Sequence, residues 1–184
     1  MAAEKSVIET GRLVLVPMTT RFFEACLAGD LDAASQRIGL RVPDDWLLEG
    51  AVMRVFLDRL RQNPTAQPWL MRAIGLRATG EMIGTIGFHL PPGAEYLRDL
   101  APGGVEMGYT VFPAWRRQGY AREACAGLMG WATREQGITR FVVSISPENE
   151  PSLRLAAHFG FRKVGYHIDD EDGLEDIFVR EAEA

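Results

Sequence analysis

The sequence predicts an α/β fold of the mixed α+β kind, built as a single domain. Its 184 residues fit one domain, because domains commonly contain about 100 to 200 residues. Hydrophobic residues make up 47% of the chain and charged residues 24%, which supplies enough apolar side chain for a core. In the C-terminal half, segments with strand and helix patterns alternate, which favours parallel crossovers. We expect one domain over residues 1–184, with about seven strands in a central sheet, about four helices, and a disordered start over residues 1–10.

Apolar periodicity defines the elements of the first half. Residues 12–16 (RLVLV) form a β-branched and leucine run that predicts a strand, ended by the proline that follows. Residues 20–28 and 45–61 carry apolar side chains at helical spacing and predict two amphipathic helices. Residues 69–77 and 82–90 flank a glycine-containing turn, so they predict an antiparallel hairpin.

In the second half, a loop precedes a strand with two distinct faces. Residues 91–104 contain proline, glycine and mixed charge without periodicity, and loops of this length are often functional. Residues 105–112 alternate between an apolar face and a face that includes Glu106. The remaining elements follow the same patterns: helices over 121–136 and 151–159, and strands over 140–145, 161–168 and 174–180.

Charge and residue usage exclude several classes of protein. A net charge of −5 argues against binding to nucleic acid or to an anionic membrane surface. Cys26 and Cys125 lie in apolar helical patterns, which indicates reduced, buried thiols. His89, His158 and His167 fall on different elements, so we expect no metal site. No run approaches the roughly 18 apolar residues of a membrane span, and we expect a cytoplasmic protein.

The strongest chemical signal is a basic, glycine-containing segment between a strand and a helix, Arg116–Ala121 (RRQGYA). Backbone N–H groups at a helix N-terminus attract anions, and Gly119 lets an anion approach without a Cβ. The segment lacks the glycine-lysine-serine/threonine ending of a nucleotide-triphosphate loop and the three glycines of a dinucleotide loop. We therefore expect it to hold a pyrophosphate of another kind.

This segment resembles the acyl-CoA loop of the GNAT superfamily of N-acyltransferases, which has the pattern Arg116-x-x-Gly119-x-Ala121 after a strand. Two other motifs agree. Asn149-x-x-Ser152, followed by a helix and Gly160-Phe161, is similar to the family's second cofactor-side motif, and Arg12-Leu13-x-Leu15 resembles its first strand. The chain is most similar to the bacterial subgroup that includes ribosomal-protein N-terminal acetyltransferases.

The resemblance implies a sheet that splays open between the strands at 105–112 and 140–145, with the pantetheine of acetyl-CoA in the split. The pantetheine amides would pair with the strand edge near Val111. Asn149 and Ser152 would lie beside the pantetheine and thiol. The pyrophosphate would rest on the loop residues, namely Arg116, Arg117, Gln118, Gly119, Tyr120 and Ala121.

The implied reaction is attack of a primary amine on the thioester, within a ternary complex that releases CoA and needs no metal. An ammonium has no lone pair, so a base must remove a proton, and Glu106 is the candidate. A backbone N–H near Val111 would stabilise the oxyanion. The family's frequent acid is a tyrosine seven residues after the asparagine, where this chain has Ala156. Ser152 is the candidate substitute, and departure of the thiolate toward water is the alternative.

Two other classes of function remain open at this point. A non-catalytic acyl-CoA-binding sensor or regulatory module would keep the loop and need no base, and the missing tyrosine favours it. An unrelated phosphate-ligand protein would bind without dependence on pantetheine. The acceptor is expected to be an amine on a peptide or a small molecule, and an exposed strand edge makes a homodimer an expectation.

Overall fold

A computed structural model of the protein describes residues 7–169 and 173–182. The chain forms two compact units. One consists of residues up to Gly87 together with Tyr109–Leu128, and the other of Phe88–Gly108 together with residues from Met129 onward. The hydrogen-bonded order of the strands is β1-β2-β3-β4-β5-β6-β8-β7, a mixed sheet that confirms the expected fold class.

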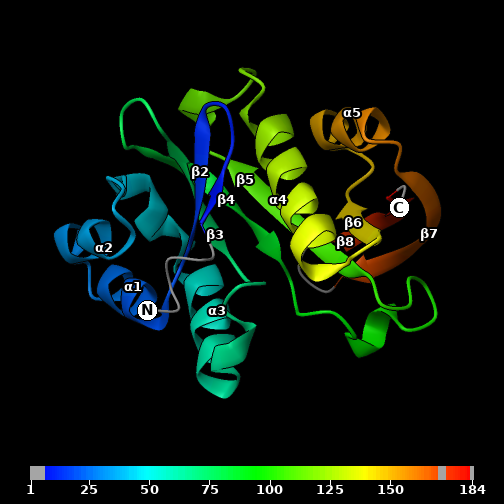
Figure 1. The fold of residues 1–184 in the computed structure, drawn as a ribbon, viewed down its shortest axis with the longest axis horizontal. Coiled ribbons are helices and arrows are strands. Elements are labelled where there is room, and N and C mark those ends of the chain that lie inside the picture. Colours follow the sequence, from blue (N-terminus) through cyan, green and yellow to red (C-terminus); the bar gives the residue numbers. More distant parts are fainter. Residues whose placement is uncertain (1–6, 170–172, 183–184) are drawn as a thin grey trace. The chain divides into compact units, whose positions relative to one another are not determined.

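The first unit combines antiparallel strands with three helices that gather against them (Figure 1). Its strands pair through backbone bonds in the order β1, β2, β3, with a bulge between β3 and β4 at Ile74 and Gly75. The elements are β1 (Ile8–Glu9), β2 (Leu13–Pro17), α1 (Thr20–Leu27), α2 (Leu31–Ile38), α3 (Gly50–Gln62), β3 (Arg72–Leu76) and β4 (Met82–Phe88).

A hydrophobic core fills this unit because the helices turn their apolar stripes to one another and to the strands. Burying each large side chain of this kind contributes about 1.5 to 3 kcal/mol. Rings from α1 and α3 meet there, with Phe23 stacked on Phe56 at 6.5 Å between centroids. The largest fully buried apolar side chains of the cluster are Met18, Phe22, Phe23, Trp46, Met53, Leu60 and Leu70.

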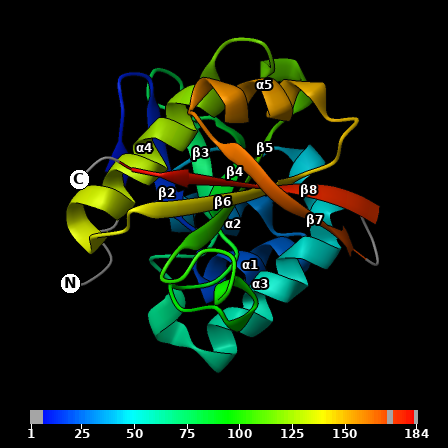
Figure 2. The same cartoon turned by 90° about the vertical axis from the view of Figure 1, so that its right-hand side faces the viewer.

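The second unit combines parallel and antiparallel pairs of strands with helical segments, and its strands can be followed in Figure 2. β6 pairs antiparallel with β8, and β8 pairs antiparallel with β7. β8 therefore lies between β6 and β7, and those two strands run parallel to one another, as the predicted crossover requires. Its elements are β6 (Arg140–Ile145), α5 (Glu150–His158), β7 (Arg162–Asp169) and β8 (Gly173–Glu181).

Two elements run through both units: β5 (Val105–Val111) and α4 (Tyr120–Gln136). In the second unit, β5 pairs in parallel with β6 at Val105↔Phe141 and Glu106↔Val142. The segment 91–104, predicted as a loop, contains a 3-10 turn at Glu95–Leu97, and its buried Leu97 packs with Val142.

Several sequence expectations needed correction. Ile8 and Glu9 pair with β2, so the expected disorder is wrong for those residues, while residues 1–6 lie outside the described part. The helix α2 was missed, although Asp30 caps it by accepting from Ala33 N and Gly39 ends it at φ 68°. The predicted helix over 45–61 begins as a 3-10 turn at Asp44–Glu49. Both cysteines are free and buried, as predicted. In the part of the chain that is described, no helix is long and apolar enough to cross a membrane.

We predict that Gly84→Ala destabilises the protein, because a Cβ at Gly84 would lie 2.1 Å from the carbonyl oxygen of Thr110. Backbone cannot yield as a flexible side chain can, so the loss in unfolding free energy should be about 1 to 3 kcal/mol or more. Denaturant unfolding measures it. Gly165→Ala is the matched control, because nothing lies within 4 Å of a Cβ there. Equal midpoints for the two variants would contradict the close approach of β4 and β5.

Candidate active site

The loop after β5 has the geometry of an anion site. Arg116, Arg117, Gln118 and Gly119 are all exposed. Arg117 has φ 60° and Gly119 has φ 80°, so the backbone turns through the left-handed region twice before α4. The first helical bond runs from Glu123 N to Gly119 O, which leaves the N–H groups of residues 120–122 without partners inside the helix. Such donors, with the helix dipole behind them, suit a pyrophosphate.

Arg12, directly before β2, contacts this loop from a distant part of the sequence. Its guanidinium lies 4.5 Å from the Tyr120 ring centroid and donates to the carbonyl of Gln118 at 3.1 Å. It also pairs with the Glu123 carboxylate at 2.7 Å. Glu123 accepts in addition from the Thr10 hydroxyl at 2.6 Å. Burial would raise the pKa of Glu123, but Thr10 and Arg12 outweigh it and lower that pKa. Arg12 therefore offsets a negative charge beside the predicted pyrophosphate site.

Arg116 has a structural task that the sequence did not reveal. Its Nε donates to the carbonyl oxygen of Val111 at 2.9 Å, so the side chain holds the end of β5. Two predicted cofactor residues are thus in direct contact. Arg117 and the loop N–H groups are the remaining basic and donor groups of the predicted set, and their chemistry fits a diphosphate.

Glu106 is buried in the second unit, with a relative exposure of 6%. The Ser144 hydroxyl on β6 donates to its Oε1 at 2.6 Å. The Nδ1 atom of His89, directly after β4, lies 3.5 Å from its Oε2. Tyr96, from the 3-10 turn, forms a hydrogen bond with the same carboxylate. Glu106 is therefore surrounded by polar side chains and does not face solvent.

This environment keeps Glu106 ionised. Burial would raise the pKa of its carboxyl, but the His89 ring, the Ser144 hydroxyl and the Tyr96 hydroxyl together lower that pKa to about 2. An unpartnered buried carboxylate would cost several kcal/mol, and these donors remove that cost. Near neutral pH the group is an anion with weak basicity.

Asn149 and Ser152 are brought together at the start of α5. The Asn149 side-chain oxygen accepts from the backbone N–H of Ser152 at 3.2 Å, which makes Asn149 the N-cap of the helix. Both residues have at least partial exposure. Ala156, at the position of the family's tyrosine, is buried at 5% exposure.

The thiols do not look like nucleophiles. Burial raises the pKa of Cys26 to about 11, against a smaller lowering by Trp46. Burial also raises the pKa of Cys125 far above its ordinary value. A thiol must be a thiolate to attack, so neither cysteine suits an acyl-enzyme mechanism. Among the described side chains, no group of three or more metal-binding residues occurs.

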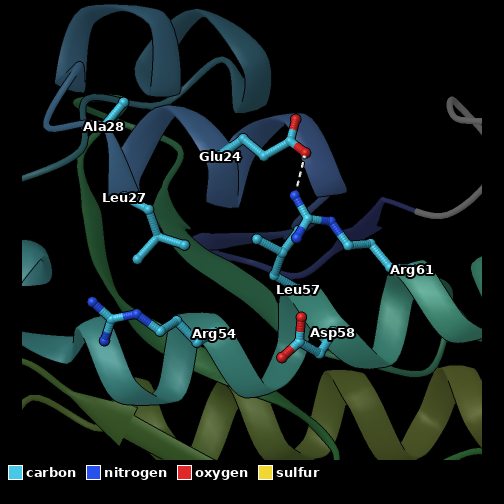
Figure 3. A pocket seen from close by; sticks show the side chains of 7 residues that line it. All are labelled: Glu24, Leu27, Ala28, Arg54, Leu57, Asp58 and Arg61. Carbon is cyan, nitrogen blue, oxygen red and sulfur yellow. Dashed lines mark hydrogen bonds and ion pairs between the residues drawn. The ribbon is translucent and has the colours of Figure 1, made fainter.

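A separate open hollow of about 480 Å³ lies between α1 and α3 (Figure 3). Leu27 and Leu57 form its apolar part, and Glu24 and Arg61 pair across it at 2.9 Å. None of the residues predicted for the active site lines this hollow. Acidic and basic side chains both line the hollow, and we assign it no part in the predicted active site.

Sequence reasoning missed the three side chains that surround Glu106, namely His89, Tyr96 and Ser144. It also missed that Arg12 contacts the loop and pairs with Glu123. His89 donates its backbone N–H to the carbonyl of Glu106 at 2.9 Å, so the two are cross-strand neighbours. A register for the strands at 82–90 and 105–112 would have found that pair. Ser144 and Tyr96 carried no comparable signal, because only the packed structure brings them to Glu106.

Comparison with known proteins identifies the family of this chain. Residues 12–162 match the family model of the acetyltransferase (GNAT) domain. An uncharacterized N-acetyltransferase of Bacillus subtilis, YoaA, is 30% identical over 161 residues, which cover 86% of this chain and 84% of the relative. These matches confirm the expected family and enzyme class.

Solved structures show the same fold. One described as a GNAT-family acetyltransferase from Bordetella pertussis has a TM-score of 0.66 and 26% identity, covering 95% of this chain and 98% of its own. RimL, a ribosomal L7/L12 alpha-N-protein acetyltransferase in complex with coenzyme A, has a TM-score of 0.63 and 16% identity, covering 96% and 98%. The second likeness is one of fold alone.

We predict that Arg12→Gln weakens binding of CoA about three- to tenfold, because the Glu123 carboxylate then stands uncompensated beside the loop. Isothermal titration with CoA measures this. Arg41→Gln removes a comparable exposed arginine, paired with Glu81, and should leave affinity unchanged. The double variant Arg12→Gln/Glu123→Gln should recover part of the loss. Wild-type affinity in Arg12→Gln would contradict the charge-balancing role.

We predict that Arg117→Gly lowers affinity for CoA without destabilising the loop backbone. A left-handed non-glycine residue costs about 1 to 2 kcal/mol, and the flexibility of glycine takes back about 0.5 to 1 kcal/mol. Thermal stability should therefore be unchanged or slightly higher, while affinity for CoA falls with the lost guanidinium. In Arg116→Gly, stability should instead decrease, because the bond to Val111 is lost. Melting curves and titrations of both variants test the distinction.

Proposed function

We propose that this chain, which belongs to the acetyltransferase (GNAT) family, transfers an acetyl group from acetyl-CoA to a primary amine by direct attack in a ternary complex. The observation that carries the proposal is the exposed loop at 116–119, with two left-handed residues directly before the N-terminus of α4. Free N–H groups, a helix dipole and Arg117 at one point suit a pyrophosphate. The coenzyme A in the RimL structure supports the choice of ligand.

We assign the binding roles to the loop, to the end of β5 and to the start of α5. We assign the pyrophosphate to Arg116–Ala121, with Arg117 supplying charge and Gly119 supplying space. The pantetheine end is assigned to Val111, Asn149 and Ser152. A pantetheine amide that used the Val111 carbonyl as acceptor would compete with the Arg116 side chain for it.

The chemical roles are assigned to Glu106 and Ser152. The amine must lose a proton before its nitrogen can attack the thioester carbon, and the Glu106 carboxylate drives that loss, directly or through a neighbouring group. A backbone N–H near Val111 stabilises the oxyanion. The C–S bond then breaks, and Ser152 or water supplies the proton that the leaving sulfur takes up.

The acceptor is proposed to be an amine on a peptide or a small molecule. A peptide α-amine is favoured, because RimL, which shares the fold, is named for acetylating the N-terminus of a ribosomal protein. A cytoplasmic location and a homodimer belong to the same proposal.

A second candidate is a sensor that binds acyl-CoA without catalysis. The specific observation in its favour is Ala156, a buried methyl group where the family often has a tyrosine. A sensor would bind CoA and release no thiol with any amine. An enzyme releases thiol when acetyl-CoA and an amine are present together.

We predict that acetyl-CoA and CoA bind in isothermal titration, and that ADP, which has a pyrophosphate but no pantetheine, binds at least tenfold more weakly. Gly119→Val should abolish binding, because a β-branched residue resists φ 80° and crowds the anion. Gly29→Val is the matched control, with φ 75°, nothing within 4 Å of its Cβ, and a place outside the loop. Undiminished affinity in Gly119→Val would refute the loop assignment. Equal affinity for ADP and CoA would favour an unrelated phosphate-binding protein.

A further inference from the structure

We propose that His89, oriented by the Glu106 carboxylate, is the group that takes the proton from the acceptor amine. The inference rests on the proposed acetyl transfer and names the base within it. Glu106 then becomes a positioning residue, and His89 becomes the catalytic residue that meets the substrate.

The burial of the two side chains separates their tasks. The Glu106 side chain is 7% exposed, whereas the His89 side chain is 45% exposed. An acceptor amine arriving from solvent can therefore reach the imidazole more easily than the carboxylate. The carboxylate is also surrounded by donors, with Ser144 at 2.6 Å and Tyr96 beside it. Its lone pairs are engaged, so it is poorly placed to accept a proton from a substrate.

Contacts of both the backbone and the ring set the position of His89. The His89 backbone N–H donates to the Glu106 carbonyl, and the ring Nδ1 faces the Glu106 carboxylate at 3.5 Å. Its Nε2 lies over Gly108, where a Cβ would come within 2.8 Å of it. The absence of a side chain at Gly108 is what leaves room for the ring. A carboxylate on Nδ1 sets the tautomer with the proton on that nitrogen, so Nε2 carries the lone pair.

The basicity of the two groups points the same way. Proton transfer is most effective when the base titrates near the working pH. Glu106, with a pKa near 2, holds protons too weakly for this task. Histidine is the residue type whose charge changes near neutral pH, and an adjacent carboxylate stabilises the imidazolium once it forms.

The proton balance is complete without another reactant. Nε2 of His89 takes one proton from the ammonium, and the freed amine nitrogen forms a bond to the thioester carbon. The C–S bond breaks with its electron pair going to sulfur. The second proton lost by nitrogen neutralises the thiolate as CoA–SH, and His89 releases its proton to solvent.

The kinetic test uses the full-length protein, acetyl-CoA, and two acceptor probes, spermidine and an alanine-initiated hexapeptide. We expect kcat/KM of the wild type to rise with pH through one ionisation as the imidazole becomes neutral. His89→Gln should lower kcat about 10²- to 10³-fold, abolish that ionisation and leave CoA affinity within about twofold. In Glu106→Gln the ionisation should persist while kcat falls less than in His89→Gln, because the base remains and only the carboxylate that orients it is lost.

Two further variants sharpen the kinetic test. His167→Gln is the matched control, since His167 pairs with Glu175 at 3.2 Å and is 41% exposed, and its kinetics should equal those of the wild type. Gly108→Ala displaces the ring without removing it and should lower kcat while leaving CoA affinity intact. If His89→Gln retains wild-type kcat and pH dependence, the inference is overturned, and loss of all activity in Glu106→Gln would then return the role of base to Glu106.

A second readout does not depend on turnover. The chain has three histidines, so the ring nitrogen resonances of each can be followed by NMR. Glu106→Gln should shift the ring nitrogen resonances of His89, because the carboxylate that faces Nδ1 is replaced by an amide, and leave those of His167 in place. Unmoved His89 resonances would overturn the pairing even if the enzyme is active. Absence of turnover in the wild type with both amines, despite CoA binding and the expected NMR shift, would instead count against the proposed function.

Discussion

The constraint on which the site depends is that one strand, β5, serves two purposes along seven residues. Near its start it must bury Glu106 among polar partners, and at its end it must present Val111 and lead into an exposed anion loop. Glu106 belongs to the second unit, whereas Val111 and the loop after it belong to the first. Within the second unit, β5 pairs in parallel with β6 at Val105 and Glu106.

Charge compensation is the second organising feature, and it is local in each cluster. Glu123 would weaken an anion site at the start of α4, yet Arg12 and Thr10 bind it from the start of the chain. Glu106 would be costly in the core of its unit, yet three side chains satisfy it. In both cases burial alone pushes the carboxyl toward the neutral form and specific donors reverse the effect. The two carboxylates are thus held ionised by residues that lie far from them in sequence.

The sequence was sufficient for those features that depend on short spacing. The alternation in 105–112, the RRQGYA segment and the helical stripes all reflect local periodicity, and the strands and helices lie close to the predicted ranges. It was insufficient where the third dimension decides. The alternating pattern could not show that Ser144 and the 3-10 turn cover Glu106, nor that Arg12 reaches Glu123 across 111 positions. It also could not show that Arg117, a non-glycine residue, turns through φ 60°, because arginine gives no signal for that conformation.

The histidines illustrate why scattered positions are weak evidence against a site. Metal ligands must converge in groups of three or four, and the three histidines lie on three different parts of the fold. A proton relay needs only one histidine and one carboxylate, and a single cross-strand contact supplies both. A buried carboxylate that is held strongly ionised is a weak base. An exposed side chain that contacts it is then the better candidate to accept a proton from the substrate. In this protein that reasoning leads from Glu106 to His89. The imidazole ring fits beside Gly108 because glycine has no Cβ.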